Sequence, residues 1–288
     1  MLHGYTPSHR FLPYLSWTDI DNLPDKENTV IVLPVGAIEQ HGAHLPCSVD
    51  ATVAAGVVGK ALELLPADIP AFAIPGIVYG KSDEHLHFPG TITLTGEILL
   101  HTIQEIGESI YRAGFRKLIM VNAHGGQPQP LEMAARELRL RHGDYMVIAR
   151  SAWSVPHDGS SFSEQEKQLA MHAGHGETSI MMALLGEYVH MERAETHYPE
   201  PFPCPTLSTG RPAAAWTSFD FGPSGVIGDP TKANLELGQQ LLDQLGASWA
   251  QAIQEVHEAQ WITRSAQSWG RSQFNGYVHS QDSAEKIK

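Results

Sequence analysis

One short segment of the chain carries three side chains of the kind that bind metal ions. Glu39 and His41 stand two residues apart, and Asp50 follows them closely. In an extended segment, residues two apart point to the same side, so Glu39 and His41 would face one site. Carboxylates and imidazoles are common ligands of divalent transition metals. This segment alone therefore predicts about half of a metal site.

A second segment places His124 between an apolar run, residues 117–122, and the glycines Gly125 and Gly126. Such a turn could instead bind an anion through backbone N–H groups at the start of a helix. The nucleotide-binding patterns GxGxxG and GxxxxGK[ST] are absent from it. An imidazole at a strand end, with glycines that let a ligand approach closely, favours a metal or substrate site.

The third segment reads HAGHGETS and contributes His172, His175 and Glu177, separated by Gly174 and Gly176. Glu177 opens a predicted helix, where the helix dipole alone would favour its negative charge. The glycines would let the loop wrap around a ligand. The patterns HExxH and GxSxG do not occur, so neither zincin nor serine-hydrolase chemistry is indicated.

Asp50 has a structural alternative, because it directly precedes a predicted helix over residues 51–65 and could serve as its N-cap. No Glu or Gln stands at the third helical position, which Val53 occupies, so a capping box is not predicted. Together with Glu39 and His41, a metal-bridging role is favoured. The two roles are compatible, with one carboxylate oxygen for each.

The elements that must position these residues alternate along the chain. Strands are predicted at 29–35, 71–78, 117–122 and 145–149, and helices at 51–65, 95–113, 130–142, 177–186 and 233–257. Repeated β-then-α units predict a single three-layer α/β/α domain with a mostly parallel sheet. In such sheets the functional loops follow the carboxyl ends of the strands, where Glu39, His41 and His124 fall.

The predicted domain spans residues 1–262, and residues 263–288 are a polar C-terminal tail. The segment 198–223, rich in Pro, Ser and Thr, is expected to be a long irregular loop within that domain. No linker composition divides the chain in two.

Bulk composition limits the classes of function. Hydrophobic residues make up 42% and charged residues 18%, which is typical of a folded soluble protein. The net charge of −13 argues against a nucleic-acid partner. Cys47 and Cys204 are expected to be free thiols, and no signal peptide or membrane span is predicted, so a cytoplasmic protein is expected.

Taken together, the three segments strongly resemble the creatininase family of metal-dependent amidohydrolases, in order and at compatible spacings from about Leu33 to Gly238. The resemblance implies two divalent metal ions per subunit, Zn or Mn. One ion would be bound by Glu39, Asp50 and His124. The other would be bound by His41, Asp50 and Glu177, with Asp50 as the bridge.

The resemblance also implies a mechanism in which a metal-bridged hydroxide attacks an amide carbonyl. His172 matches a family histidine that helps protonate the leaving nitrogen, and Glu177 is counted with it among the catalytic residues. His87 falls in a loop that the family shares near the active site. A tryptophan that encloses creatinine is matched by Trp153, and His175 is expected close to the substrate.

Three departures weaken the match to creatinine itself. The creatinine enzymes carry a tyrosine at Gly125, a metal-ligand glutamate at Gly126 and a second tryptophan at Gln168. The sequence therefore predicts hydrolysis of a non-peptide C–N bond in a small cyclic amide. The alternatives are a formamide deformylase, a modified-peptide hydrolase, or a non-catalytic metal-binding assembly protein. Family resemblance implies a homo-oligomer, with a hexamer expected.

Overall fold

The computed structural model describes residues 2–200, 204 and 215–260 of the chain. The predicted tail, residues 263–288, lies outside the described residues, as do residues 201–203 and 205–214 of the predicted loop 198–223. Within the described part, the architecture follows the predicted alternation of strands and helices.

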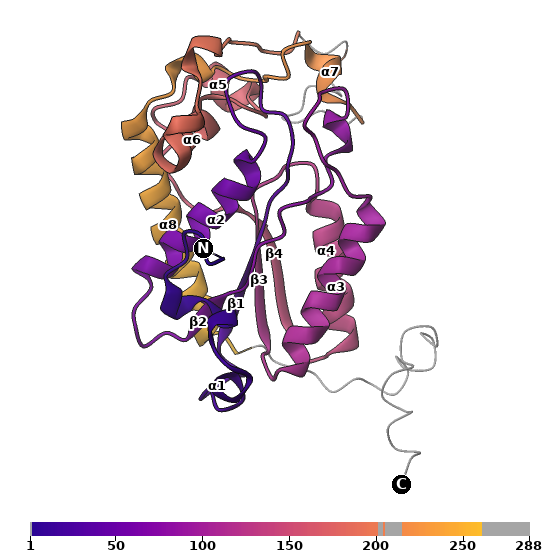
Figure 1. The fold of residues 1–288 in the computed structure, drawn as a ribbon, viewed down its shortest axis with the longest axis vertical. Coiled ribbons are helices and arrows are strands. Elements are labelled where there is room, and N and C mark those ends of the chain that lie inside the picture. The colour runs from indigo at the N-terminus through magenta and orange to yellow at the C-terminus, as the bar shows by residue number, and fades with distance from the viewer. Residues whose placement is uncertain (1, 201–203, 205–214, 261–288) are drawn as a thin grey trace.

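Four parallel strands form the sheet in the order β2-β1-β3-β4 (Figure 1). They are β1 (Val30–Val35), β2 (Ala71–Ala73), β3 (Lys117–Asn122) and β4 (Met146–Ser151). In the central pair, Val30 is level with Lys117 and Val35 with Asn122. Every residue of these two strands is buried, because helices cover both faces of the sheet.

The helices form two layers around the sheet (Figure 1). The α2 helix (Val49–Leu64), α6 (His175–Leu185) and α8 (Leu235–Glu258) share one apolar core with one face of the sheet. The α3 helix (Gly96–Arg112) and α4 (Pro128–Arg141) share a second core with the other face. The chain is thus a three-layer α/β/α protein, as its sequence predicts.

Shorter elements lie in the connections. The short α-helices are α1 (Trp17–Asp21), α5 (Glu164–Leu169) and α7 (Ser218–Phe221). The 3₁₀ helices are η1 (Ser8–Arg10), η2 (Leu12–Tyr14), η3 (Asp83–His85), η4 (Ala152–Ser154), η5 (Gly186–Tyr188), η6 (Met191–Arg193) and η8 (Pro230–Lys232). Of these, η3 matters most for function, because it enters the candidate site.

The second strand is shorter than the sequence predicts. It ends at Ala73, whereas the apolar run continues to Val78. Pro75 has no N–H to donate and Gly76 adds no side chain to pack, so a regular ladder cannot continue through them. Pairing resumes only as an isolated bridge between Val35 and Ile77.

The N-cap interpretation of Asp50 is wrong. The α2 helix begins at Val49, so Asp50 lies within its first turn, and Ser48 takes the N-cap position without a side-chain hydrogen bond. The Asp50 carboxylate points instead toward His41 and His124. Its position is therefore set by the site and not by helix capping.

No helix in the described ranges is both long and apolar enough to cross a lipid bilayer.

Candidate metal centre

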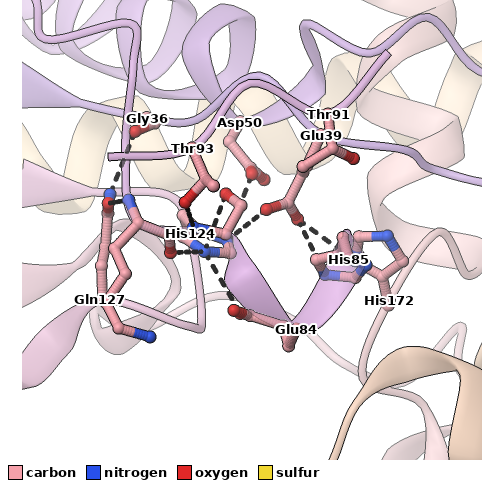
Figure 2. A network of polar contacts seen from close by, with 12 residues as sticks. Gly36, Glu39, Asp50, Glu84, His85, Thr91, Thr93, His124, Gln127 and His172 are labelled. Carbon is pink, nitrogen blue, oxygen red and sulfur yellow. Dashed lines mark hydrogen bonds and ion pairs between the residues drawn. The ribbon is translucent and has the colours of Figure 1, made fainter. Parts of the chain in front are cut away.

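The carboxyl edge of the sheet gathers the predicted metal ligands, and Figure 2 shows three of them, Glu39, Asp50 and His124, facing one another. Glu39 and His41 lie in the loop after β1, and His124 lies directly after β3. Asp50 comes from the first turn of α2 and Glu177 from the first turn of α6. Because parallel strands end at the same edge, residues far apart in sequence meet there.

The Asp50 carboxylate lies between two imidazoles. His124 Nδ1 is 3.3 Å from Asp50 Oδ2 and 3.1 Å from Glu39 Oε2. His41 Nε2 is 3.4 Å from the other oxygen, Asp50 Oδ1. Each oxygen of the Asp50 carboxylate therefore faces a different imidazole nitrogen.

Burial leaves several of these atoms without partners. Glu39 and His41 are fully buried, and Asp50 is 3% exposed. Among the described residues, both oxygens of Glu39, His41 Nε2 and Asp50 Oδ2 find no hydrogen-bond partner. Buried polar atoms almost always have a hydrogen-bond partner. A buried cluster of carboxylate oxygens and an imidazole nitrogen without such partners therefore fits the binding of a metal ion.

The spacing and chemistry of these atoms fit divalent ions. Ligand atoms of Glu39, Asp50 and His124 lie within 4.8 Å of one another. The same holds for His41, His172 and Glu177. Mixed nitrogen and oxygen donors without thiolates suit Zn or Mn, and Cys47 belongs to neither group.

The electrostatics of the centre also favour a bound cation. Burial, together with the charge of Asp50, raises the pKa of Glu39. Burial raises the pKa of Glu177 to about 7. Burial alone would lower the pKa of His41, but Asp50, Glu177 and Glu39 together raise it to about 9. A divalent ion would relieve the mutual repulsion of these carboxylates.

Backbone carbonyls fix the orientation of three imidazoles. His41 Nδ1 is 3.1 Å from the carbonyl of Glu39, and His124 Nε2 is 2.8 Å from that of Lys81. His172 Nε2 is 2.6 Å from the carbonyl of Gln40. Because a carbonyl only accepts, each of these nitrogens carries a hydrogen, and the other ring nitrogen faces the site.

His172 lies at the centre, as the sequence predicts for a catalytic residue. Its ring is 4.1 Å from that of His41, and its Nδ1 is 3.7 Å from Glu39 Oε1. Burial and the neighbouring His41 hold the pKa of His172 well below its ordinary value. The surroundings of the ring therefore favour its neutral form.

A cavity of about 240 Å³ opens beside this centre, and His172 and Glu177 form part of its wall. Trp153 and Gly125 line it, as predicted for the substrate site, and Phe162 adds a second aromatic ring. A Cβ atom at Gly125 would meet nothing within 4 Å, so the cavity is open at that point.

Two predicted substrate-site residues lie away from this cavity. His87 is exposed and stacks on Phe219, with 5.2 Å between ring centroids. His175 is buried against Phe162 and lines a separate hollow at the start of α8. Its backbone N–H donates to Glu166, so the residue supports the loop that carries His172.

The structure adds a histidine that the sequence interpretation missed. His85 Nε2 is 3.3 Å from Glu39 Oε1, and its ring stacks on His172 at 4.3 Å. Glu84, on the same 3₁₀ helix, lines the cavity at the metal centre. Glu84 and His85 are both titratable and lie just before the predicted His87 loop, and this was the signal in the sequence that could have found them. The sequence does not say whether their side chains point into the site.

Fold and site together define a metal-binding α/β/α protein with a histidine–carboxylate centre at the carboxyl edge of its sheet. Residues 13–253 match the family described as creatinine amidohydrolase. The chain therefore belongs to the creatininase family, hydrolases that act on C–N bonds.

Individual relatives support this assignment. The creatinine amidohydrolase of Pseudomonas putida is 31% identical over 260 residues, which cover 85% of this chain and 96% of that protein. The mycofactocin precursor peptide peptidase of Mycolicibacterium smegmatis is 31% identical over 223 residues, 75% of this chain and 81% of that protein. A solved structure titled "Creatininase Mn" has a TM-score of 0.71 and 29% identity, and the match covers 87% of this chain and 99% of that one.

Proposed function

We propose that the protein hydrolyses a non-peptide C–N bond in a small cyclic amide or a formamide, with two divalent ions, Zn or Mn, at the Asp50 centre. The observation that carries this proposal is the set of orphaned, fully buried ligand atoms next to an aromatic-lined cavity. A purely structural cluster would satisfy its polar atoms internally. A non-catalytic role would give no reason to keep His172 beside the cavity.

In this proposal Glu39, Asp50 and His124 hold one ion, and His41, Asp50 and Glu177 hold the other. When bound, such a pair supplies an activated water and a Lewis acid for the amide carbonyl. Lone pairs on His41 Nε2 and His124 Nδ1 are aimed by the backbone carbonyls behind each ring. The protein's part is thus to present preoriented ligands in a dry pocket.

His172 moves the proton. Its Nε2–H is engaged with the Gln40 carbonyl, so Nδ1 is the atom that accepts a proton and then delivers it to the leaving nitrogen. Burial keeps the ring neutral before the reaction. Trp153 and Phe162 exclude water and offer flat surfaces to the substrate.

The open space at Gly125 bears on the substrate. A pocket without a large side chain there holds a small, flat ring loosely, and losing one aromatic contact costs on the order of 1 kcal/mol in binding. Creatinine should therefore be a poor substrate, and bulkier formylated or cyclic amides better ones.

The same opening favours a second candidate, hydrolysis of a modified peptide. A further hollow lined by Glu132 and Arg150 shares Gly125 and Ser151 with this cavity, and a longer substrate could extend toward it. The peptidase relative of Mycolicibacterium smegmatis is consistent with this candidate.

The test is a substrate screen on protein reconstituted with Mn or Zn, with metal content measured by elemental analysis. Near two ions per chain, and turnover of formylated or cyclic amides above that of creatinine, are expected. Mass spectrometry of peptide amides incubated with the same protein tests the second candidate. Creatinine hydrolysis with kcat/KM above about 10⁴ M⁻¹s⁻¹ would contradict the substrate preference.

A further inference from the structure

Glu84 brings an additional carboxylate to a small cavity at the metal centre, which shares Gly125, His172 and Glu177 with the cavity lined by Trp153. It lies on η3, and its side chain is 12% exposed at the wall shared with Glu39, Asp50 and Glu177 (Figure 2). The backbone of η3 is held there by Ser218, a buried residue of α7 whose hydroxyl donates to the Glu84 carbonyl at 3.0 Å. The carboxylate is therefore held in place by the fold.

Within this cavity the Glu84 carboxylate forms an ion pair with the imidazole of His124. Glu84 Oε1 is 3.4 Å from His124 Nε2, but that N–H already donates to the Lys81 carbonyl at 2.8 Å. A carboxylate can accept several hydrogen bonds, so this pair leaves lone pairs of Glu84 for a further donor. None of the described residues that line the cavity is a Lys or Arg.

Gly126 leaves the space that this carboxylate occupies. A Cβ atom at position 126 would overlap Glu84 Oε1 and come within 2.6 Å of His124 Nε2. The φ angle of Gly126 is not in the left-handed region, so the requirement for glycine here is space and not backbone conformation. The Glu84 carboxylate therefore occupies space that a side chain at position 126 would need.

Charge balance separates Glu84 from the metal ligands. In the proposed centre, two divalent ions are balanced by Glu39, Asp50, Glu177 and one hydroxide. Glu84 belongs to none of the groups of metal-ligand atoms in the described structure. It therefore adds one negative charge to the wall of this cavity, which Trp216 also lines.

We propose that Glu84 is a specificity residue that accepts hydrogen bonds from a cationic nitrogen group of the amide substrate, such as an ammonium, amidinium or guanidinium. This inference rests on the proposed function, because it places the substrate in the cavity at the metal centre. A buried carboxylate with a free oxygen lone pair prefers a charged donor to a neutral one.

The experiment is a calorimetric titration of the metal-reconstituted full chain with methylguanidinium and with its neutral isostere N-methylurea. Wild type should bind methylguanidinium more tightly. Glu84→Gln should weaken that binding roughly 10- to 100-fold, the usual worth of a hydrogen bond to a charged group, and leave N-methylurea unaffected. Asp83→Asn, on the exposed side of the same 3₁₀ helix, is the matched control and should bind both probes as wild type does.

Gly126→Ala provides a second variant that leaves the carboxylate intact. The added methyl group should displace Glu84 and cause a similar loss of methylguanidinium affinity. In a Glu84→Ala background, which removes the overlap with the Glu84 carboxylate, Gly126→Ala should add no further loss of methylguanidinium affinity. Metal content is measured for every variant.

Three results would overturn the proposal: equal wild-type affinity for the two probes, an unchanged affinity in Glu84→Gln, or loss of metal from Glu84→Gln. The last would mean that Glu84 acts through His124. A protein that binds methylguanidinium through Glu84 but hydrolyses no amide would refute the proposed function and leave this inference standing. If the protein hydrolyses amides but Glu84→Gln does not change its affinity for methylguanidinium, this inference alone would be refuted.

Discussion

The loops at the carboxyl ends of β1 and β3 build two buried polar regions that differ in how their atoms are satisfied. Gln127 is fully buried, and its side-chain nitrogen donates to the Gly36 carbonyl and to Asn122, each at 3.0 Å. Its oxygen accepts the Lys81 N–H at 3.0 Å. Figure 2 shows this Gln127 network on one side of His124 and the metal centre on the other.

The difference between the Gln127 network and the metal centre indicates a structural role for the first and a functional role for the second. Every hydrogen-bonding group of the Gln127 network meets a protein partner, so the network joins β1, β3 and the loop before η3. The metal centre is equally buried but leaves Glu39, His41 and Asp50 with orphaned atoms. Since such atoms destabilise a folded chain, they indicate a site that is completed by a ligand.

The largest expected effect is at Asp50. Asp50→Asn should lower metal content to one ion or less and abolish amide hydrolysis, because a neutral amide cannot bridge two cations. A chelator should lower the melting temperature of wild type but hardly change that of the variant. Elemental analysis, turnover and thermal unfolding measure these effects. A variant that retains two ions would show that Asp50 is not the bridge.

His172→Ala should retain both ions and slow turnover by roughly 10²- to 10⁴-fold, the usual contribution of general acid–base catalysis. His172→Gln, which preserves a donor toward the Gln40 carbonyl, serves as the control for loop structure. The structure also places a ligand atom of His172 within 4.8 Å of ligand atoms of Glu177 and His41. Loss of metal from His172→Ala would therefore reassign the residue as a ligand.

In the Gln127 network the expected effect is on stability. Gln127→Ala leaves the Gly36 carbonyl and the Lys81 N–H buried without a partner, at a cost of about 1–3 kcal/mol in the free energy of unfolding. Urea denaturation measures the loss, and metal content should stay near two ions per chain. Gln251→Ala, at an exposed position on α8, should change neither quantity. Loss of metal from Gln127→Ala would mean that the two regions depend on each other.

The smallest expected effect concerns His44, which is buried behind the metal loop and contacts Thr178 at 3.0 Å. Burial, with a smaller contribution from His41, lowers the pKa of His44 from 6.5 to about 4. The unfolded chain therefore binds a proton at a higher pH than the folded one. Stability is lost as the pH falls from about 6.5 toward 4, by up to about 2 kcal/mol between pH 7 and pH 5.

His44→Asn should reduce this acid dependence, measured as the difference in unfolding free energy between pH 7 and pH 5. His9→Asn, at an exposed position, should leave it as in wild type. An unchanged dependence in His44→Asn would place the acid-sensitive group elsewhere.

Much of the fold could be predicted because its signals are local. The strands at 30–35 and 117–122 and the helix at 96–112 lie within a residue of their predicted bounds. Apolar periodicity and capping residues depend only on neighbours in sequence. The predicted end of the second strand was wrong, because the apolar run 71–78 contains Pro75, which has no N–H to donate to the ladder.

The sequence by itself determined the residue types of the metal centre, since Glu39, His41, Asp50, His124 and Glu177 all follow strand ends or open helices in short, recognisable segments. Only the tertiary structure decided which nearby residues join them. It turned Glu84 and His85 inward on η3, and it left His87 exposed and His175 in a separate hollow. The direction of a side chain in a short 3₁₀ turn is set by what packs against that turn, here α7, and such contacts between distant segments leave no local pattern in the sequence.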